Sequence, residues 1–319
     1  MEYHVLGRTG VNVSSLCLGT MTFGTDADEE SSAAMFYCCR EKGINLFDCA
    51  NIYGDGRAEQ ILGKLIAGCR NEVIVTSKVY HPTGEDINAR GLSRRHITRA
   101  VEESLKRLGT DRIELYFVHL IDPNTPIEEV VRTLDDLVCQ GKILYPGVSN
   151  WAAWQITKAL GISEQRGLAR FECIEPLYNL VKRQAEVEIL PMAQSEQLGV
   201  ISYSPLAAGL LTGKYVTEKE PEHGRLVEDE IYIRRYHKPA YFAIAKRFST
   251  YAKERGFHPA TLAVAWVMSH PAITAPIIGA RNVEQLEVSL AALEVKMTPE
   301  WREEISAFSY KPPSADDRD

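Results

Sequence analysis

Four polar side chains lie at or just beyond the ends of strand-like apolar runs in the first half of the chain. They are Asp48, Tyr53, Lys78 and His119. A charge at the end of a buried strand is costly unless it is paired. Because such endings recur along one chain, we expect these side chains to meet at one mouth of the fold.

These residue types suit proton transfer to a carbonyl group. A tyrosine with a pKa of about 10 is a poor acid at neutral pH. An ammonium group against the phenol favours phenolate, and a carboxylate behind it keeps the ammonium charged and aimed. Lys78 and Asp48 supply these groups for Tyr53, and His119 adds a hydrogen bond that could orient a carbonyl oxygen or share the proton. One strand-end aspartate or lysine alone more often forms a salt bridge at a barrel rim, but the ordered set of four favours chemistry.

Strand-like and helix-like stretches alternate along the chain, as is typical of β–α units. The predicted strands span residues 16–20, 44–49, 73–78, 113–119, 143–148, 172–177, 200–204 and 275–279. The predicted helices span residues 29–42, 57–66, 93–107, 127–140, 152–160, 184–197, 238–269 (broken near His258-Pro259) and 282–293, with a short helix near 299–307.

This α/β pattern predicts a closed (β/α)8 barrel, the TIM barrel, as a single domain over residues 1–319. A doubly wound open sheet is the alternative, but the segment from Gly19 to Gly24 lacks the glycine-rich turn of that fold. Residues 4–7 and 11–14 flank a turn and predict a β-hairpin before the barrel. Residues 206–237, after the seventh strand, show no clear periodicity and predict a long functional or disordered loop.

Composition narrows the class of protein. A net charge of -7 argues against nucleic acid or an anionic membrane as a partner. No run of 18 apolar residues is present, and the first residues do not have the layout of a signal peptide. The seven cysteines form no CxxC pair, so we expect no metal site, no disulfide framework and a cytoplasmic location.

The motifs together resemble the aldo-keto reductase superfamily, from near Leu6 to Leu293. The resemblance is carried by the segments 43–50, 53–54, 59–63, 147–150, 203–206 and 279–281, together with Lys78 and His119. It implies a (β/α)8 barrel that transfers hydride between a nicotinamide cofactor, usually NADPH, and a carbonyl or alcohol. Tyr53 would be the proton donor, Lys78 and Asp48 would tune it, and His119 would position the carbonyl oxygen.

The resemblance also implies a nicotinamide site at the ends of later strands. Ser149 and Asn150 would hold the carboxamide, and Tyr203 would stack on one face of the ring, unless it is a core tyrosine. Glu175 replaces the glutamine usual at its position. A carboxylate accepts from the carboxamide NH2 but cannot donate to its oxygen unless it is protonated. Trp151 follows Asn150 and either lines the substrate pocket or packs in the core.

The rest of the dinucleotide would lie along the loop after the seventh strand and the end of the last strand. Backbone N–H groups near Ser204 and Gly209 could approach a pyrophosphate, with Lys214, Lys219 and Arg225 beside it. Arg281, next to a predicted helix start, suits the 2′-phosphate of NADPH. The expected cofactor-binding set is completed by Gly19, Thr20, Met21, Asp48, Pro205, Leu206, Gly279 and Gln285. Val288-Ser289 replaces the Glu-Asn pair that commonly holds the adenine.

These observations favour an NADPH-dependent reductase of small aldehydes or ketones. A sugar or secondary-alcohol dehydrogenase running in the oxidative direction is an alternative, because the sequence does not set the direction of the reaction. A second alternative is a cofactor-binding regulatory subunit, as in the potassium channel β subunits that share this fold. Against it, the sequence offers no obvious docking segment. The oligomeric state is not indicated.

Overall fold

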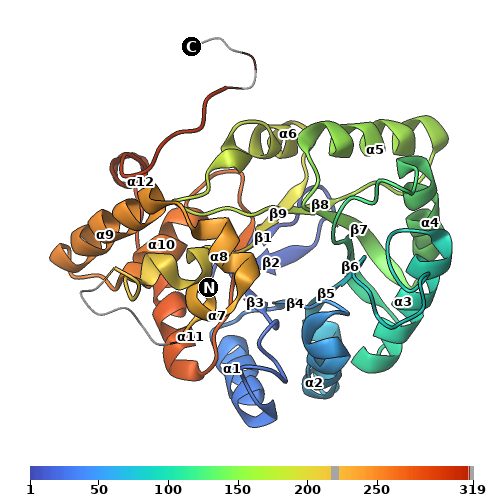
Figure 1. The fold of residues 1–319 in the computed structure, drawn as a ribbon. Helices are drawn as coiled ribbons and strands as arrows, with labels where there is room; N and C mark the ends of the chain where they lie inside the picture. Colours follow the sequence, from blue (N-terminus) through green and yellow to red (C-terminus); the bar gives the residue numbers. More distant parts are fainter. Residues whose placement is uncertain (217–222, 315, 317–319) are drawn as a thin grey trace.

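The computed structural model describes residues 1–216, 223–314 and 316 (Figure 1). Eight parallel strands close into a barrel in the order β10-β3-β4-β5-β6-β7-β8-β9. They are β3 (Cys17–Gly19), β4 (Leu46–Asp48), β5 (Ile74–Val79), β6 (Ile113–Val118), β7 (Ile143–Ser149), β8 (Cys173–Glu175), β9 (Gly199–Ser202) and β10 (Ala275–Ile278). The predicted (β/α)8 barrel is therefore confirmed.

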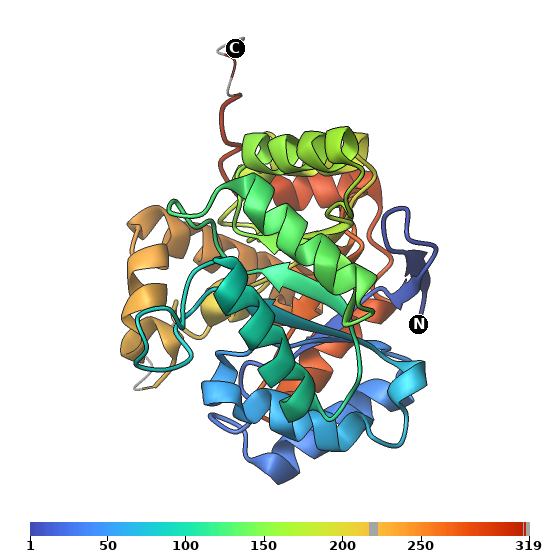
Figure 2. The ribbon, with the colours of Figure 1, turned by 90° about the vertical axis from the view of Figure 1, so that its right-hand side faces the viewer.

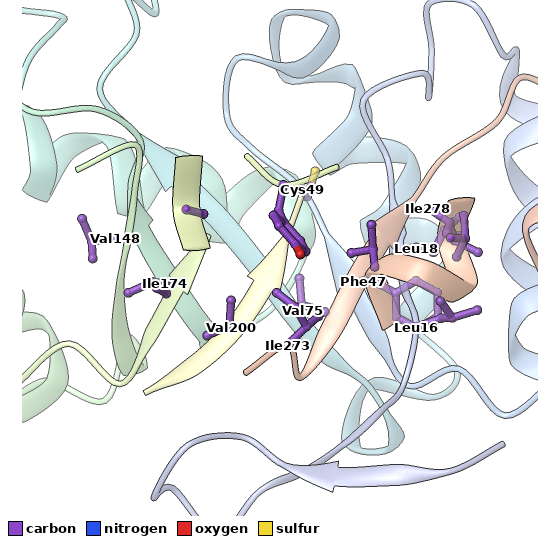
Figure 3. Close-up of a cluster of buried hydrophobic side chains, with 14 of the residues drawn as sticks. Leu16, Leu18, Phe47, Cys49, Val75, Val148, Ile174, Val200, Ile273 and Ile278 are labelled. Atoms are coloured by element: carbon purple, nitrogen blue, oxygen red, sulfur yellow. The ribbon is translucent and has the colours of Figure 1, made fainter. Parts of the chain in front are cut away.

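The strands are buried on both faces, and alternation along each strand decides which side chain enters the barrel. In β6, Leu115 and Phe117 belong to the cluster inside the barrel, whereas Tyr116 and Val118 belong to the layer between strands and helices. Figure 3 shows part of that outer layer, with Phe47, Val75 and other side chains on neighbouring strands. The side chains that point into the barrel are apolar in its interior. The same alternation continues to the carboxyl ends of the strands and decides which residues point inward there.

Helices surround the barrel as the sequence predicts (Figure 1). They are α1 (Glu29–Glu41), α2 (Arg57–Ile66), α3 (Arg94–Leu108), α4 (Ile127–Cys139), α5 (Ala153–Arg166), α6 (Ile189–Ser195), α9 (Pro239–Glu254), α10 (Pro259–Met268), α11 (Val283–Leu290) and α12 (Pro299–Ser306). In α3, Ser93 accepts a hydrogen bond from the His96 N–H at the helix start, and Gly109 ends the helix at a φ of 63°. Ile97, Val101 and Leu108 share its buried face. None of the helices in the described ranges is long and apolar enough to cross a membrane.

A small hairpin precedes the barrel, as predicted, and it closes the amino-terminal end. Its strands β1 (Tyr3–Val5) and β2 (Asn12–Ser14) pair antiparallel, and the hairpin lies at the right of Figure 2. Leu6 and Val13 extend the cluster inside the barrel and are at most 1% exposed. The hairpin therefore covers apolar side chains that would otherwise face water.

The segment after β9 differs from the predicted irregular loop. Among its described residues it forms a 3-10 helix (Ala207–Thr212) and two short helices, α7 (Arg225–Glu228) and α8 (Glu230–Tyr236). Tyr236 is buried and receives a hydrogen bond from the Asn179 side chain at 3.1 Å. Contact with the barrel, rather than helical periodicity, therefore stabilises this segment. Lys219 lies outside the described residues.

Replacement of Leu6 by alanine tests the role of the hairpin. Because Leu6 is 1% exposed inside the apolar cluster, we expect L6A to lower the free energy of unfolding by about 2–5 kcal/mol, measured by urea denaturation. Val5→Ala is the matched control, since Val5 is 52% exposed, and it should change stability by no more than about 0.5 kcal/mol. Equal, small effects of both changes would contradict the assigned role.

Candidate active site

The inward register places one residue from each strand end at the carboxyl-terminal mouth of the barrel. In each strand this residue lies an even number of positions beyond an apolar side chain that points into the barrel, for example Cys17 in β3 and Ala275 in β10. The eight residues are Gly19, Asp48, Lys78, His119, Ser149, Glu175, Tyr203 and Gly279. All eight are predicted site residues, and barrel closure brings them together.

Lys78 is at the centre of this group. Its ammonium nitrogen lies 2.5 Å from Asp48 Oδ1, 3.0 Å from the Cys49 carbonyl oxygen and 3.4 Å from the Tyr53 hydroxyl. Glu175 Oε2 lies 3.3 Å from the same nitrogen. Asp48 is held in turn by the Thr76 hydroxyl, which donates at 2.6 Å. The predicted Tyr53–Lys78–Asp48 chain is thus assembled, with a second carboxylate beside it.

Burial and the neighbouring charges together set the pKa values of Lys78 and Glu175. Burial alone lowers the pKa of Lys78, but Asp48 and Glu175 outweigh it, so the net shift is well above the ordinary value. Burial and the neighbouring Asp48 raise the pKa of Glu175 well above its ordinary value, against the attraction of Lys78. Two carboxyl groups therefore share the single ammonium group of Lys78.

Tyr53 and His119 are both held in their neutral forms. Burial raises the pKa of Tyr53, and Lys78 lowers it by a smaller amount, so the effect of Lys78 predicted from the sequence is present but is not the largest. Burial, Lys78 and His81 lower the pKa of His119 well below its ordinary value. Both side chains line the cavity at this mouth. A phenol O–H and a neutral imidazole are therefore available to a carbonyl oxygen.

Asn150 joins three strand ends. Its side-chain nitrogen donates to the His119 carbonyl at 3.0 Å and to Ser149 Oγ at 2.8 Å, and its oxygen accepts from the Tyr203 hydroxyl at 2.6 Å. Ser149 in turn donates to the Glu175 carbonyl at 2.8 Å. Asn150 adopts a φ of 59°, an uncommon conformation outside glycine that functional sites often contain. Ser149 and Asn150, which were predicted to hold the carboxamide, are thus part of a hydrogen-bond network that fixes the Tyr203 ring.

A cavity of about 830 Å³ opens at this mouth. Of the predicted site residues, it is lined by Gly19, Met21, Asp48, Tyr53, His119, Asn150, Glu175, Tyr203, Ser204, Pro205, Leu206, Gly209, Lys214, Gly279, Arg281 and Gln285. Its lining includes Tyr53 at one end and residues at the start of α11 at the other. The predicted site is therefore one continuous space rather than scattered positions.

The wall after β9 has a strained backbone. Ser204, Ala207 and Ala208 have φ values of 62°, 51° and 57°, and Gly209 follows at 91°. Non-glycine residues in this region cost energy and cluster at ligand sites. Lys214 and Arg225 line the same wall. Cationic side chains next to a tightly turned backbone form an environment that suits a pyrophosphate group.

The far end of the cavity lies at the start of α11. Asn282 caps this helix by accepting from the Gln285 N–H, and Gln285 Oε1 accepts from the Arg281 N–H at 3.2 Å. Arg281 also lies 3.2 Å from Asp26, and both side chains are partly exposed. A helix start beside a guanidinium group suits an anion.

Four predicted residues, Thr20, Lys78, Ser149 and Trp151, lie behind the cavity wall. Trp151 is 3% exposed and packs edge-on against Phe171, so the structure places it in the core rather than in a substrate pocket. Thr20 is fully buried, with its hydroxyl donating to the Asp48 carbonyl at 2.9 Å. Ser149 and Thr20 support the residues that do face the cavity.

Several lining residues were not predicted. His81, Tyr232, Arg235 and His258 line the cavity, and the His81 ring lies edge-on to His119 at 4.8 Å between centroids. His258 had only a helix-break signal, the following proline, and it does cap α10. His81 lies two residues beyond the end of β5, and Tyr232 and Arg235 lie on α8, which has no strand ending near it.

The lining residues fit a nicotinamide dinucleotide. Glu175 Oε2 is a buried polar atom without a hydrogen-bond partner among the described residues, at the end of the cavity that holds Tyr53. At the opposite end, Arg281 and the α11 start provide positive charge. Tyr203 would cover one face of the nicotinamide, Lys214 and Arg225 would contact the pyrophosphate, and Arg281 the adenosine phosphate.

Comparison with known proteins identifies the family. The model of the aldo/keto reductase family matches residues 15–309. The chain is 42% identical to "Uncharacterized oxidoreductase YrpG" of Bacillus subtilis (strain 168), over 94% of this chain and 93% of the relative. It is 35% identical to "Probable voltage-gated potassium channel subunit beta" of Oryza sativa subsp. japonica, over 98% of each chain. It is also 32% identical to "Versiconal hemiacetal acetate reductase" of Aspergillus parasiticus, over 94% of each.

The chain belongs to the aldo/keto reductase family. It is an NAD(P)H-dependent oxidoreductase built on a TIM barrel.

The neutrality of His119 can be measured directly. Because burial, Lys78 and His81 lower its pKa, we expect the imidazole to stay neutral at pH 6.5, where an ordinary histidine is about half protonated. Ring-nitrogen NMR over pH 5–8 gives the protonation state, and the loss of the signal in His119→Gln assigns it. A midpoint near pH 6.5 would show that the ring is not buried as described.

Proposed function

We propose that this protein reduces a small aldehyde or ketone to an alcohol, with NADPH as the cofactor and Tyr53 as the proton donor. The observation that carries the proposal is the Asp48–Lys78–Tyr53 chain, which ends in a cavity also lined by His119. We further propose that residues 1–319 act as one domain. A cytoplasmic location is supported by seven free cysteines.

The chemistry needs a hydride and a proton. A nicotinamide cofactor, when bound, would supply the hydride for the carbonyl carbon. His119, neutral and lining the cavity, would hold the carbonyl oxygen beside the Tyr53 hydroxyl. Tyr53 would give its proton to that oxygen as negative charge develops, leaving a phenolate against the Lys78 ammonium. A solvent proton would then restore the phenol.

Replacement of Tyr53 by phenylalanine removes only the transferable proton. We expect Y53F to lower the rate of carbonyl reduction by orders of magnitude, since acid catalysis alone contributes about 10²–10⁴-fold. The variant should still bind NADPH, as measured by the fluorescence of the cofactor. Near wild-type turnover in this variant would contradict the assignment of Tyr53 as the acid.

The preference for NADPH rests on Arg281. A charge-assisted hydrogen bond to the 2′-phosphate should be worth about 1.5–3 kcal/mol, or tenfold or more in affinity. We expect wild-type protein to bind NADPH at least about tenfold more tightly than NADH, and Arg281→Ala to remove most of that difference. Arg255→Ala is the matched control, because Arg255 is a surface arginine paired with Glu304. Equal binding of NADPH and NADH by the wild type would contradict this role.

A cofactor-binding regulatory subunit is the second candidate. Relatives named as potassium channel β subunits, from Oryza sativa subsp. japonica and Arabidopsis thaliana, favour it. The two candidates differ in turnover: a reductase consumes NADPH steadily with a carbonyl substrate. An assay against a panel of aldehydes, ketones and sugars, in both directions, separates these functions and identifies the substrate class.

A further inference from the structure

Lys78 has more partners than its ammonium group has N–H donors. The three donors of an ammonium group are matched by Asp48 Oδ1, the Cys49 carbonyl and the Tyr53 hydroxyl. Glu175 Oε2 lies 3.3 Å from the nitrogen, within ion-pair distance, yet it accepts no hydrogen bond from any described residue. Glu175 Oε2 therefore lies in the field of Lys78, while the three closer acceptors match the N–H groups of the ammonium.

An ionised Glu175 would be poorly compensated. Its side chain is 4% exposed and faces the second carboxylate, Asp48, across one shared cation. A buried carboxylate that shares its one cation with a second carboxylate costs more than a protonated carboxyl group. The groups that face Glu175 from the neighbouring elements are Asp48, Tyr53, Lys78 and Tyr203, with the thiols of Cys17 and Cys173 on the inner side. Lys78 is the only cation among these groups.

We propose that Glu175 works as a neutral carboxylic acid, and that its proton allows Tyr53 to act as an acid. Glu175 would be a positioning residue, because it acts on Tyr53 through the charge around Lys78. This inference deepens the proposed function and rests on it.

Charge counting gives the reason. With Glu175 neutral, Asp48 and Lys78 cancel, and proton donation by Tyr53 leaves a net charge of one negative unit. With Glu175 ionised, the same step leaves two negative units in a buried space. Consistent with this, a negative Glu175 raises the pKa of Tyr53 and so weakens it as an acid. Loss of the Glu175 proton should therefore slow reduction.

The proton on Glu175 also links stability to pH. A glutamate in the unfolded chain has a pKa of about 4.3, whereas burial and Asp48 raise the pKa of Glu175 in the folded chain. The stabilisation from the held proton is therefore complete below about pH 4.3 and is lost as pH rises through the folded-state pKa. Between these two pH values the folding equilibrium should weaken about tenfold per pH unit.

The first arm of the test measures stability without cofactor. Urea unfolding of wild type and Glu175→Gln is compared from pH 4 to pH 8. We expect E175Q to lack the decline and to become more stable than wild type, by about tenfold in the folding equilibrium per pH unit, as pH rises from about 4.3. Parallel pH profiles for the two proteins would overturn the proposal.

Glu114→Gln is the matched control for this arm. Glu114 is also a buried strand glutamate, but it accepts from Arg70 at 2.9 Å through both oxygens and lies 3.2 Å from Arg112. Loss of that carboxylate should weaken folding at neutral pH, the opposite sign to E175Q. Stabilisation by both changes at neutral pH would overturn the proposal, because loss of any buried charge would then explain it.

The second arm measures carbonyl reduction with saturating NADPH against pH. In wild type the rate should fall as pH rises through the Glu175 ionisation, and in E175Q this alkaline limb should move to higher pH. An unmoved limb would overturn the link to Tyr53. If the protein consumes NADPH with none of the carbonyl compounds, the proposed function is refuted. The stability arm contains no cofactor, so it tests the proton on Glu175 independently of that result.

Discussion

The buried ammonium of Lys78 is the constraint on which the rest of the site depends. A fully buried cation is tolerated only with close compensation. Asp48 at 2.5 Å supplies the opposite charge, and the carboxyl group of Glu175 lies 3.3 Å away. These residues come from β4, β5 and β8, which are distant in sequence. Only a closed barrel with the observed register aligns the three side chains inward at one mouth. Fold and chemistry are therefore coupled through one ion cluster.

The two ends of the barrel divide stability from function. At the amino-terminal end, the hairpin buries Leu6 over an apolar interior. At the opposite end the same register presents polar side chains to a cavity, as in other enzymes of this architecture. The segment after β9 adds the strained turn at Ser204–Gly209 and two short helices to the cavity wall. Strain is thus placed where a ligand can contact it.

Much of the fold followed from sequence because barrel strands are short apolar runs that end in polar residues. This signal located Asp48, Lys78 and His119 and the strands that carry them.

The sequence signal failed where tertiary contact decides the structure. Helices α7 and α8 are too short to show periodicity, and Tyr236 is fixed by Asn179 from a distant segment. Trp151 had no pattern that separated core from cavity, and Arg235 reaches the cavity only because α8 lies there. The Lys78–Glu175 contact likewise required the closed barrel.

Transfer of deuterium from NADPH labelled at C4 to a carbonyl substrate tests most directly whether this barrel performs hydride transfer. The two C4 epimers of the labelled cofactor are assayed separately, and the alcohol product is analysed by mass spectrometry. Because Tyr203 is fixed by its hydrogen bond to Asn150 and would cover one face of the nicotinamide, only one epimer should deliver deuterium to the alcohol carbon. Delivery from both epimers, or from neither while NADPH is consumed, would contradict hydride transfer in this site.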